Sequence, residues 1–208
     1  MVFATGVLCL QAQPVAIKQQ LPAVGGNATY TISGYTSAQL DAVDNAPSNK
    51  PQPLSVGRLI MANYTPQSTG QWEKVYNGRI WRIKIVAQGA KGVSVYGKVN
   101  YLPKGSQLNI YNTKGTQWVN AYTNKNFSKH NILSSETVLG EEAIIEYFEP
   151  DGVNAEPQFV IEKVGYMFRE EKTYTGFQRK DFGSSDGCQV NVKCPEGDNW
   201  KTPASSVV

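Results

Sequence analysis

The stretch WRIKIV, residues 81–86, decides how this chain folds. Its side chains alternate between an apolar set and a basic set: Trp81, Ile83 and Ile85 against Arg82 and Lys84. Because successive side chains of a strand point to opposite faces of a sheet, the alternation predicts a β-strand with an apolar inner face and a polar outer face. The next segment, GVSVYGKVNYL at residues 92–102, repeats the pattern and places four residues on one face: Val93, Val95, Val99 and Tyr101.

Further strand-like segments follow at intervals of about ten residues, the spacing that is typical of an all-β sandwich. They are QLNIYN (107–112), QWVNAYT (117–123), EEAIIEYFEP (141–150) and QFVIEKVGYMF (158–168). Turn-forming segments rich in Gly, Pro, Asn and Asp separate the strands: QGAKG, LPKGS, NTKGT and EPDGVNAEP. Residues 54–169 are therefore predicted to form an antiparallel, jelly-roll-like β-sandwich.

The N-terminal residues 1–13, MVFATGVLCLQAQ, have the apolar character of a signal peptide. Gln11-Ala12-Gln13 provides a cleavage neighbourhood, so we expect export to the periplasm or the extracellular medium, with loss of Cys9. A lipoprotein interpretation of Cys9 is weaker. Residues 14–53 contain many prolines and glycines and are expected to be irregular, with a single strand in TYTISGY. The sequence has no run of the roughly 18 apolar residues that a membrane-spanning helix needs.

The charged and nucleophilic residues give little support for catalysis or for nucleic-acid binding. The net charge is +3, with acidic and basic residues interspersed, which argues against a nucleic-acid or membrane-surface partner. The single histidine, His130, is the only possible imidazole base, and we interpret it as a solvated loop residue. The adjacent Glu141 and Glu142 would point to opposite faces of a strand. No metal-ligand spacing and no phosphate-binding glycine loop is present, so no cofactor or metal is expected.

Aromatic residues leave one alternative function open. A strip of exposed rings on the sandwich would suit a secreted carbohydrate- or surface-binding module, although core packing and cross-strand pairing account for most of them. The residues concerned are Trp72, Trp81, Trp118, Tyr96, Tyr101, Tyr111 and Tyr122. Retention on a polysaccharide column that is lost on changing Trp118 would support this alternative.

The C-terminal part of the chain differs in composition from the sandwich. Residues 170–187, EEKTYTGFQRKDFGSSDG, are charged and then small and polar, as in an exposed linker that proteases cut. The segment GCQVNVKCPEGDNW follows, with Cys188 and Cys194 six positions apart and close to the last residue of the chain.

This last segment resembles the start of the mature catalytic domain in secreted bacterial trypsin-like endopeptidases of the lysyl endopeptidase group. In that family a Cys-x5-Cys-Pro-Glu-Gly-Asp segment opens the mature enzyme. The strands GRIWRIKIVAQGAKGVSVYGKVNYLPKGSQLNIYNTKG and VIEKVGYMFRE resemble the β-rich pro-region of the same precursors. Together the two resemblances cover residues 54–202.

The resemblance implies a precursor organisation. It implies that residues 188–208 begin a trypsin-like β-barrel domain, and that Cys188 and Cys194 are half-cystines whose partners lie further along. The family's His, Asp and Ser would all follow residue 208, so no catalytic residue is assigned in this chain. An enzyme that accepts lysine could process itself at Lys180-Asp181 in the linker, with Lys172-Thr173 and Arg179-Lys180 as alternatives.

We therefore expect a non-catalytic pro-region whose partner is its own downstream protease domain, which it assists in folding or inhibits until the linker is cut. We also expect a monomer.

Overall fold

The computed structural model describes residues 13–44, 55–127 and 130–169. The chain divides into two compact units, residues 1–170 and 171–208, and every described residue belongs to the first. The predictions for the signal peptide and for the segments from residue 170 onwards fall outside the described residues.

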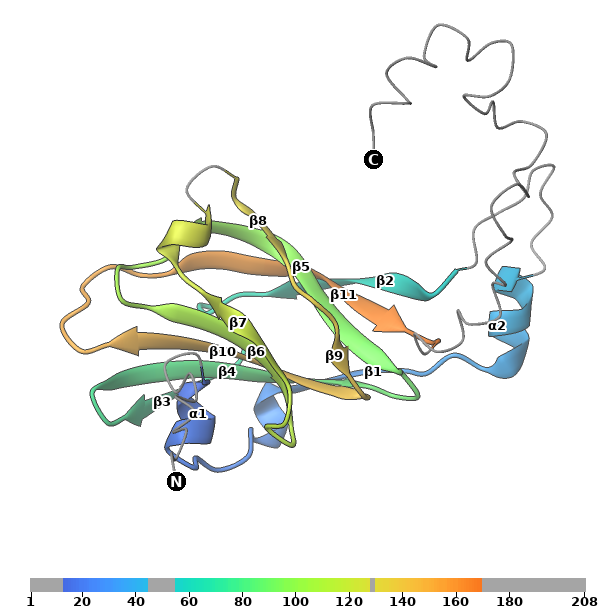
Figure 1. Ribbon diagram of the computed structural model, residues 1–208, viewed down its shortest axis with the longest axis horizontal. Coiled ribbons are helices and arrows are strands. Elements are labelled where there is room, and N and C mark those ends of the chain that lie inside the picture. The colour runs from blue at the N-terminus through green and yellow to red at the C-terminus, as the bar shows by residue number, and fades with distance from the viewer. Residues whose placement is uncertain (1–12, 45–54, 128–129, 170–208) are drawn as a thin grey trace, which may run out of the picture. The chain divides into compact units, whose positions relative to one another are not determined.

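Eleven strands make up about half of the described part, with short helices between some of them (Figure 1). The elements are α1 (Val15–Lys18), η2 (Gly26–Ala28), β1 (Thr29–Ile32), α2 (Ser37–Asp44), β2 (Gly57–Tyr64), β3 (Gln71–Val75), β4 (Gly78–Ala87), β5 (Gly92–Tyr101), β6 (Gln107–Asn112), β7 (Trp118–Tyr122), η3 (Asn124–Phe127), β8 (Ile132–Ser134), β9 (Val138–Leu139), β10 (Glu142–Pro150) and β11 (Gln158–Met167). Seven of the strands match strand-like segments identified in the sequence: β1, β4, β5, β6, β7, β10 and β11.

The strands form two sheets, which confirms the predicted all-β sandwich. Sheet A has the order β1-β4-β10-β6-β7, and β3 pairs with β4 on the same side as β1. Sheet B has the order β2-β11-β5-β8, and β9 pairs with β5 next to β8. One pairing differs from the antiparallel expectation, because β1 runs parallel to β4. This strand comes from the N-terminal segment and adds to the edge of a sheet that is otherwise antiparallel.

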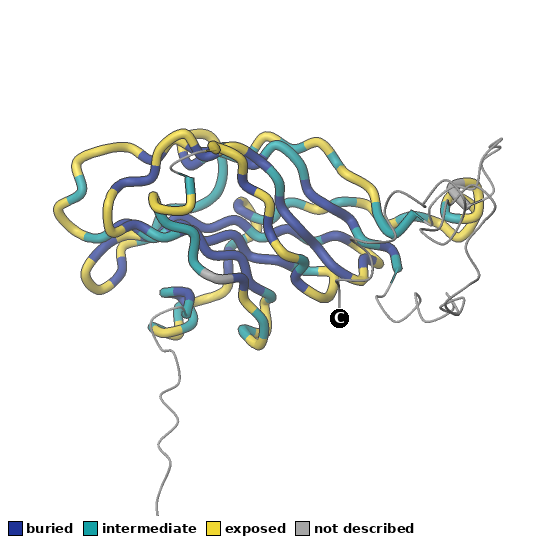
Figure 2. Tube along the Cα trace, turned by 45° about the horizontal axis from the view of Figure 1, so that its top comes forward, coloured by how far each residue is buried: buried dark blue, intermediate teal, exposed yellow. Residues whose placement is uncertain are grey.

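The core lies between the two sheets and contains the apolar residues that the alternation predicted. Trp81, Ile83 and Ile85 are fully buried, and Val93, Val95 and Val99 of the facing sheet are 1% exposed. Trp81 satisfies its indole N–H by donating to the carbonyl oxygen of Thr69 at 2.6 Å. Figure 2 shows that the buried residues run along the strands, whereas the turns are mostly exposed. Tyr101, predicted on the same face as the valines, is 44% exposed at the end of β5.

An irregularity in β11 changes which residues of this strand face the core. The pairing register shifts between Ile161 and Lys163 on both sides of the strand. Against β5, Glu162 is an extra residue, as in a β-bulge, whereas against β2 the extra residue lies in β2. As a result Ile161 and Val164, an odd and an even position, are both fully buried.

The N-terminal segment is more regular than its prolines and glycines suggested. It contains α1, η2, β1 and α2, and β1 is the strand expected in TYTISGY. Helix α2 begins after a capping box: the Thr36 amide donates to Oε1 of Gln39 at 2.8 Å, and the Gln39 amide donates to Oγ1 of Thr36 at 3.3 Å. These reciprocal bonds explain why a stretch expected to be turn-rich begins a helix.

Candidate functional site

The residues predicted for processing and for disulfide pairing cannot be placed, because Lys180, Asp181, Cys188 and Cys194 lie outside the described residues. His130 lies in the loop between η3 and β8 and is exposed, in agreement with the interpretation as a solvated loop residue. Glu142 forms an ion pair with Lys84 at 2.7 Å.

The aromatic residues do not form a continuous exposed strip in the described part of the chain. Trp81 and Tyr111 are buried, while Trp118 is 36% and Tyr101 44% exposed. Trp118 belongs to β7 of sheet A and Tyr101 to β5 of sheet B, so the two exposed rings lie on different sheets. Core packing and pairing therefore account for most of these aromatics.

The outer face of sheet A carries a row of polar side chains that are all buried. Glu146 of β10 is directly paired with Arg82 of β4 on one side and with Asn109 of β6 on the other. Glu146 and Asn109 are 0% exposed and Arg82 is 2% exposed. Burial of three adjacent polar side chains on an outer face requires a cover and hydrogen-bonding partners.

The cover is the N-terminal segment, residues 14–28, which we call the strap. In Figure 1 its helix α1 lies beside sheet A, on the side away from sheet B. Ala16 packs with Val75 and Ile80, and Val24 and Ala28 pack in a second apolar cluster. The strap therefore contacts apolar residues around the polar row.

Glu146 fixes the beginning of the strap. Its carboxylate accepts hydrogen bonds from the backbone amides of Val15 at 2.7 Å and Ala16 at 3.1 Å, and from the hydroxyl of Tyr111 at 3.1 Å. Burial raises the pKa of Glu146, and these three donors together with Arg82 offset part of that effect. Burial also raises the pKa of Tyr111, which keeps its hydroxyl a donor.

Arg82 binds the strap at a second point. Its guanidinium donates to the carbonyl oxygen of Pro22 at 2.9 Å and forms an ion pair with Glu73 of β3 at 2.6 Å. Within the described part of the chain, the Nε atom of Arg82 and the side-chain amide of Asn109 make no hydrogen bond. Glu146 and Arg82 of the polar row thus hold the strap through the backbone of Val15, Ala16 and Pro22, which is a structural role.

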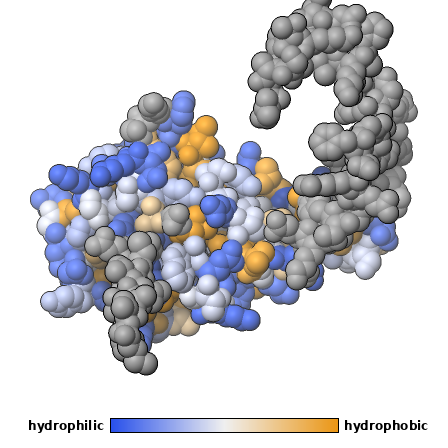
Figure 3. Space-filling view, in the orientation of Figure 1, coloured by the Kyte–Doolittle hydropathy of each residue, from blue (hydrophilic) through white to orange (hydrophobic). Residues whose placement is uncertain are grey.

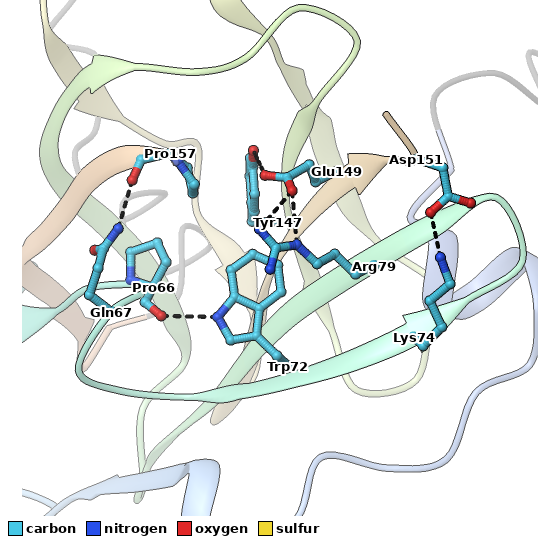
Figure 4. A network of polar contacts seen from close by, with 9 residues as sticks. All are labelled: Pro66, Gln67, Trp72, Lys74, Arg79, Tyr147, Glu149, Asp151 and Pro157. Carbon is cyan, nitrogen blue, oxygen red and sulfur yellow. Dashed lines mark hydrogen bonds and ion pairs between the residues drawn. The ribbon is translucent and has the colours of Figure 1, made fainter. Parts of the chain in front are cut away.

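A second polar network lies at the end of sheet A around the β3–β4 hairpin (Figure 4). Arg79 stacks on the Trp72 ring at 4.4 Å and forms an ion pair with Glu149 at 2.8 Å. Glu149 also accepts a hydrogen bond from the Tyr147 hydroxyl at 3.0 Å. Each charge has a partner, so the network ties the hairpin to β10.

The outer face of sheet B differs from that of sheet A. Leu59 of β2 is paired with Gly165 and Met61 with Lys163, whereas Ile60 between them is paired with the buried Val164. Leu59 and Met61 therefore point away from the core. They are 56% and 74% exposed.

The far edge of sheet B repeats this arrangement. Leu139 of β9 pairs with Gly92, while the buried Val138 faces the core. Ile132 of β8 pairs with Lys98 and is 70% exposed. Of the seven large apolar side chains that are exposed in the described residues, these four lie on the outer face of sheet B.

A shallow pocket of about 300 Å³ lies on the same face. It is lined by Val56, Gly57, Arg58, Leu59, Tyr96, Gly165 and Tyr166. Gly165 contributes no side chain, and an added Cβ there would lie 2.2 Å from Oγ of Ser94 and 3.2 Å from the Tyr96 ring. The absence of a side chain at this position therefore lets the Ser94 and Tyr96 side chains approach the backbone of β11 closely.

The described residues present hydrophobic spots among hydrophilic side chains on the face drawn in Figure 3. They contain no group of three or more His, Cys, Asp or Glu that could hold a metal ion. None of their helices is long and apolar enough to cross a membrane. A face with exposed apolar side chains and a pocket has the features of a protein-contact surface.

Comparison with known proteins agrees with the sequence and the fold. The chain matches the family described as lysyl endopeptidase N-terminal domain over residues 31–168, that is, from β1 to the end of β11. The match confirms the resemblance to the pro-region of lysyl endopeptidase precursors, and it leaves the whole strap, residues 14–28, outside the matched range. No solved structure matches the chain. The chain belongs to the lysyl endopeptidase N-terminal domain family.

Proposed function

We propose that this chain contains the pro-region of a secreted serine endopeptidase precursor and acts on the protease domain that follows it. The observation that carries the proposal is the family match over residues 31–168, which covers the sandwich strands from β1 to β11. The strap covers the polar row on the outer face of sheet A, whereas Leu59 and Met61 are exposed on the outer face of sheet B, which supports a role in binding.

The pro-region would assist folding of the protease domain, inhibit it, or do both through one binding event. A partner that binds only the folded protease stabilises it by mass action, and this stabilisation grows with the effective concentration of the partner. Covalent attachment gives the sandwich a high effective concentration near the protease domain. Cleavage of the linker would remove that advantage and release the enzyme.

The linker at residues 170–187 is the proposed place of cleavage, with Lys180-Asp181 as the first choice. Cys188 and Cys194 would then pair with cysteines of the mature protease domain. The apolar N-terminal residues 1–13 support export. Export would place Cys188 and Cys194 in an oxidising compartment, where disulfides persist.

The test compares refolding of the denatured protease domain alone with refolding in the presence of the 208-residue chain. Recovered activity is measured on a lysyl peptide substrate after the chain has been removed by proteolysis. We expect a higher yield of active enzyme with the chain, or inhibition of the folded enzyme before proteolysis. The proposal fails if the chain changes neither the yield nor the activity.

A further inference from the structure

The two outer faces of the sandwich differ in how far they are covered. The strap covers the outer face of sheet A, whereas the outer face of sheet B exposes large apolar side chains. We call the latter the open face, defined by Leu59, Met61, Tyr96, Ile132, Leu139 and Met167. We propose that the open face is the surface on which the downstream protease domain docks, an inference that rests on the proposed function.

The path of the chain leads to this face. Strand β11 lies inside sheet B, between β2 and β5, and its last residue, Met167, pairs with Gly57 and with Gly92. The described residues end at Arg169, two positions later. Whatever follows therefore begins at one end of the open face, at the strand that forms its middle. The covered face of sheet A has no such connection.

The dimensions of the open face suit a tethered partner. Four neighbouring strands about 4.8 Å apart, and strands of ten residues that rise about 3.3 Å each, give a face of about 15 by 30 Å. This area is smaller than the roughly 800 Å² per partner of a standard free interface. The segment 170–187 can extend up to about 60 Å, which is longer than the face. Because covalent attachment raises the effective concentration of the partner, a modest area suffices.

The chemistry of the face specifies what the partner presents. The pocket beside Leu59 has the size to receive one large apolar side chain, with Tyr96 as its aromatic wall. Around it the polar groups are of both signs, since Lys98 forms an ion pair with Glu162 at 3.3 Å. The partner surface is therefore an apolar patch with one protruding side chain, and strong charge of either sign is not needed.

The experiment measures binding of the 208-residue chain to the mature protease. The enzyme is first inactivated with phenylmethylsulfonyl fluoride, so that it cannot digest the chain at lysines. The double variant Leu59→Glu/Met61→Glu places two charges on the open face at exposed positions. Tyr76→Glu is the matched control, because Tyr76 is 85% exposed but belongs to the β3–β4 turn of sheet A. The dissociation constant is determined by titration calorimetry, and circular dichroism establishes that each variant is folded.

We expect the double variant to raise the dissociation constant at least tenfold and Tyr76→Glu to change it less than twofold, since charges are poorly tolerated at the centre of an interface. If the double variant does not fold, Leu139→Glu on β9 replaces it with the same expectation. Equal effects in the open-face variant and the control would overturn the docking surface and leave the proposed function standing. No binding by the wild-type chain, together with no effect on refolding, would overturn both.

Discussion

Replacement of Glu146 by alanine tests whether the strap is held by a single buried carboxylate. The change removes the acceptor of three hydrogen bonds, from the amides of Val15 and Ala16 and from the Tyr111 hydroxyl. An unsatisfied buried donor costs about 1–3 kcal/mol, and relief of the buried charge returns part of that cost. We expect a loss of about 3 kcal/mol in the free energy of unfolding.

The loss converts to a fall in melting temperature of about 6–12 °C, since about 2–4 °C corresponds to 1 kcal/mol in a domain of this size. Thermal unfolding of the 208-residue chain, followed by circular dichroism, measures it. Hydrogen exchange at the amides of Val15 and Ala16 reports on the strap itself, and both should lose protection. Glu142→Ala is the control, because Glu142 lies on the same strand and face but pairs with the partly exposed Lys84. A partly exposed ion pair of this kind contributes less than about 1 kcal/mol to the free energy of unfolding.

Glu146 does not hold the strap if Glu146→Ala lowers the free energy of unfolding no more than Glu142→Ala does, or if the Val15 and Ala16 amides keep their protection from hydrogen exchange. Either result would mean that apolar contacts, such as those of Ala16, hold the strap without the carboxylate.

Three further predictions concern pH, packing and maturation. Burial raises the pKa of Glu146 in the folded protein. The contribution of Glu146 to stability is therefore largest below a pH of about 4.5 and falls as the pH rises through its folded pKa. Glu146→Gln should remove this part of the pH dependence of the free energy of unfolding, measured by urea unfolding. Gly97→Ala should cost about 1–3 kcal/mol in the same assay, since the added Cβ would lie 2.0 Å from the backbone oxygen of Val160. Gly26→Ala, with no atom within 4 Å, should be nearly neutral, and equal costs would contradict the packing explanation. Lys180→Ala should slow maturation of the precursor on a denaturing gel, and normal maturation would rule out Lys180-Asp181 as the cleavage site.

Strand β4 could be predicted from the alternation in its sequence, whereas strand β2 was not identified. Strand β4 has an apolar residue at every second position, so its core-facing set was identified correctly. Strand β2 carries Leu59, Ile60 and Met61 in succession, with no alternation, because apolar residues occupy both its inner and its outer face. The apolar residues on the outward side of β2 remove the alternation from its sequence, and they also make the outer face of sheet B apolar.

Helix α2 was missed for a different reason. Its apolar residues do not form a helical stripe, and the signal that was present is the capping box Thr36-Ser37-Ala38-Gln39. A box of four residues is a short-range signal, and the prolines that follow at residues 47, 51 and 53 favoured a turn-rich interpretation. The reciprocal bonds between Thr36 and Gln39 decide the local structure.

The buried polar row could not be predicted from periodicity, because alternation separates two faces without saying which of them meets water. Arg82 was expected on a polar outer face, and it lies on that face, yet it is 2% exposed. The cover comes from residues about 60 positions earlier, a separation that no local pattern reports. Since Arg82 and Glu146 contact the backbone of the strap and not its side chains, the strap sequence itself carries no matching charge pattern. A buried ion on an outer face is therefore a reason to look for a distant covering segment, and apolar residues on the opposite outer face, beside the exit of the chain, are a reason to look for a partner domain.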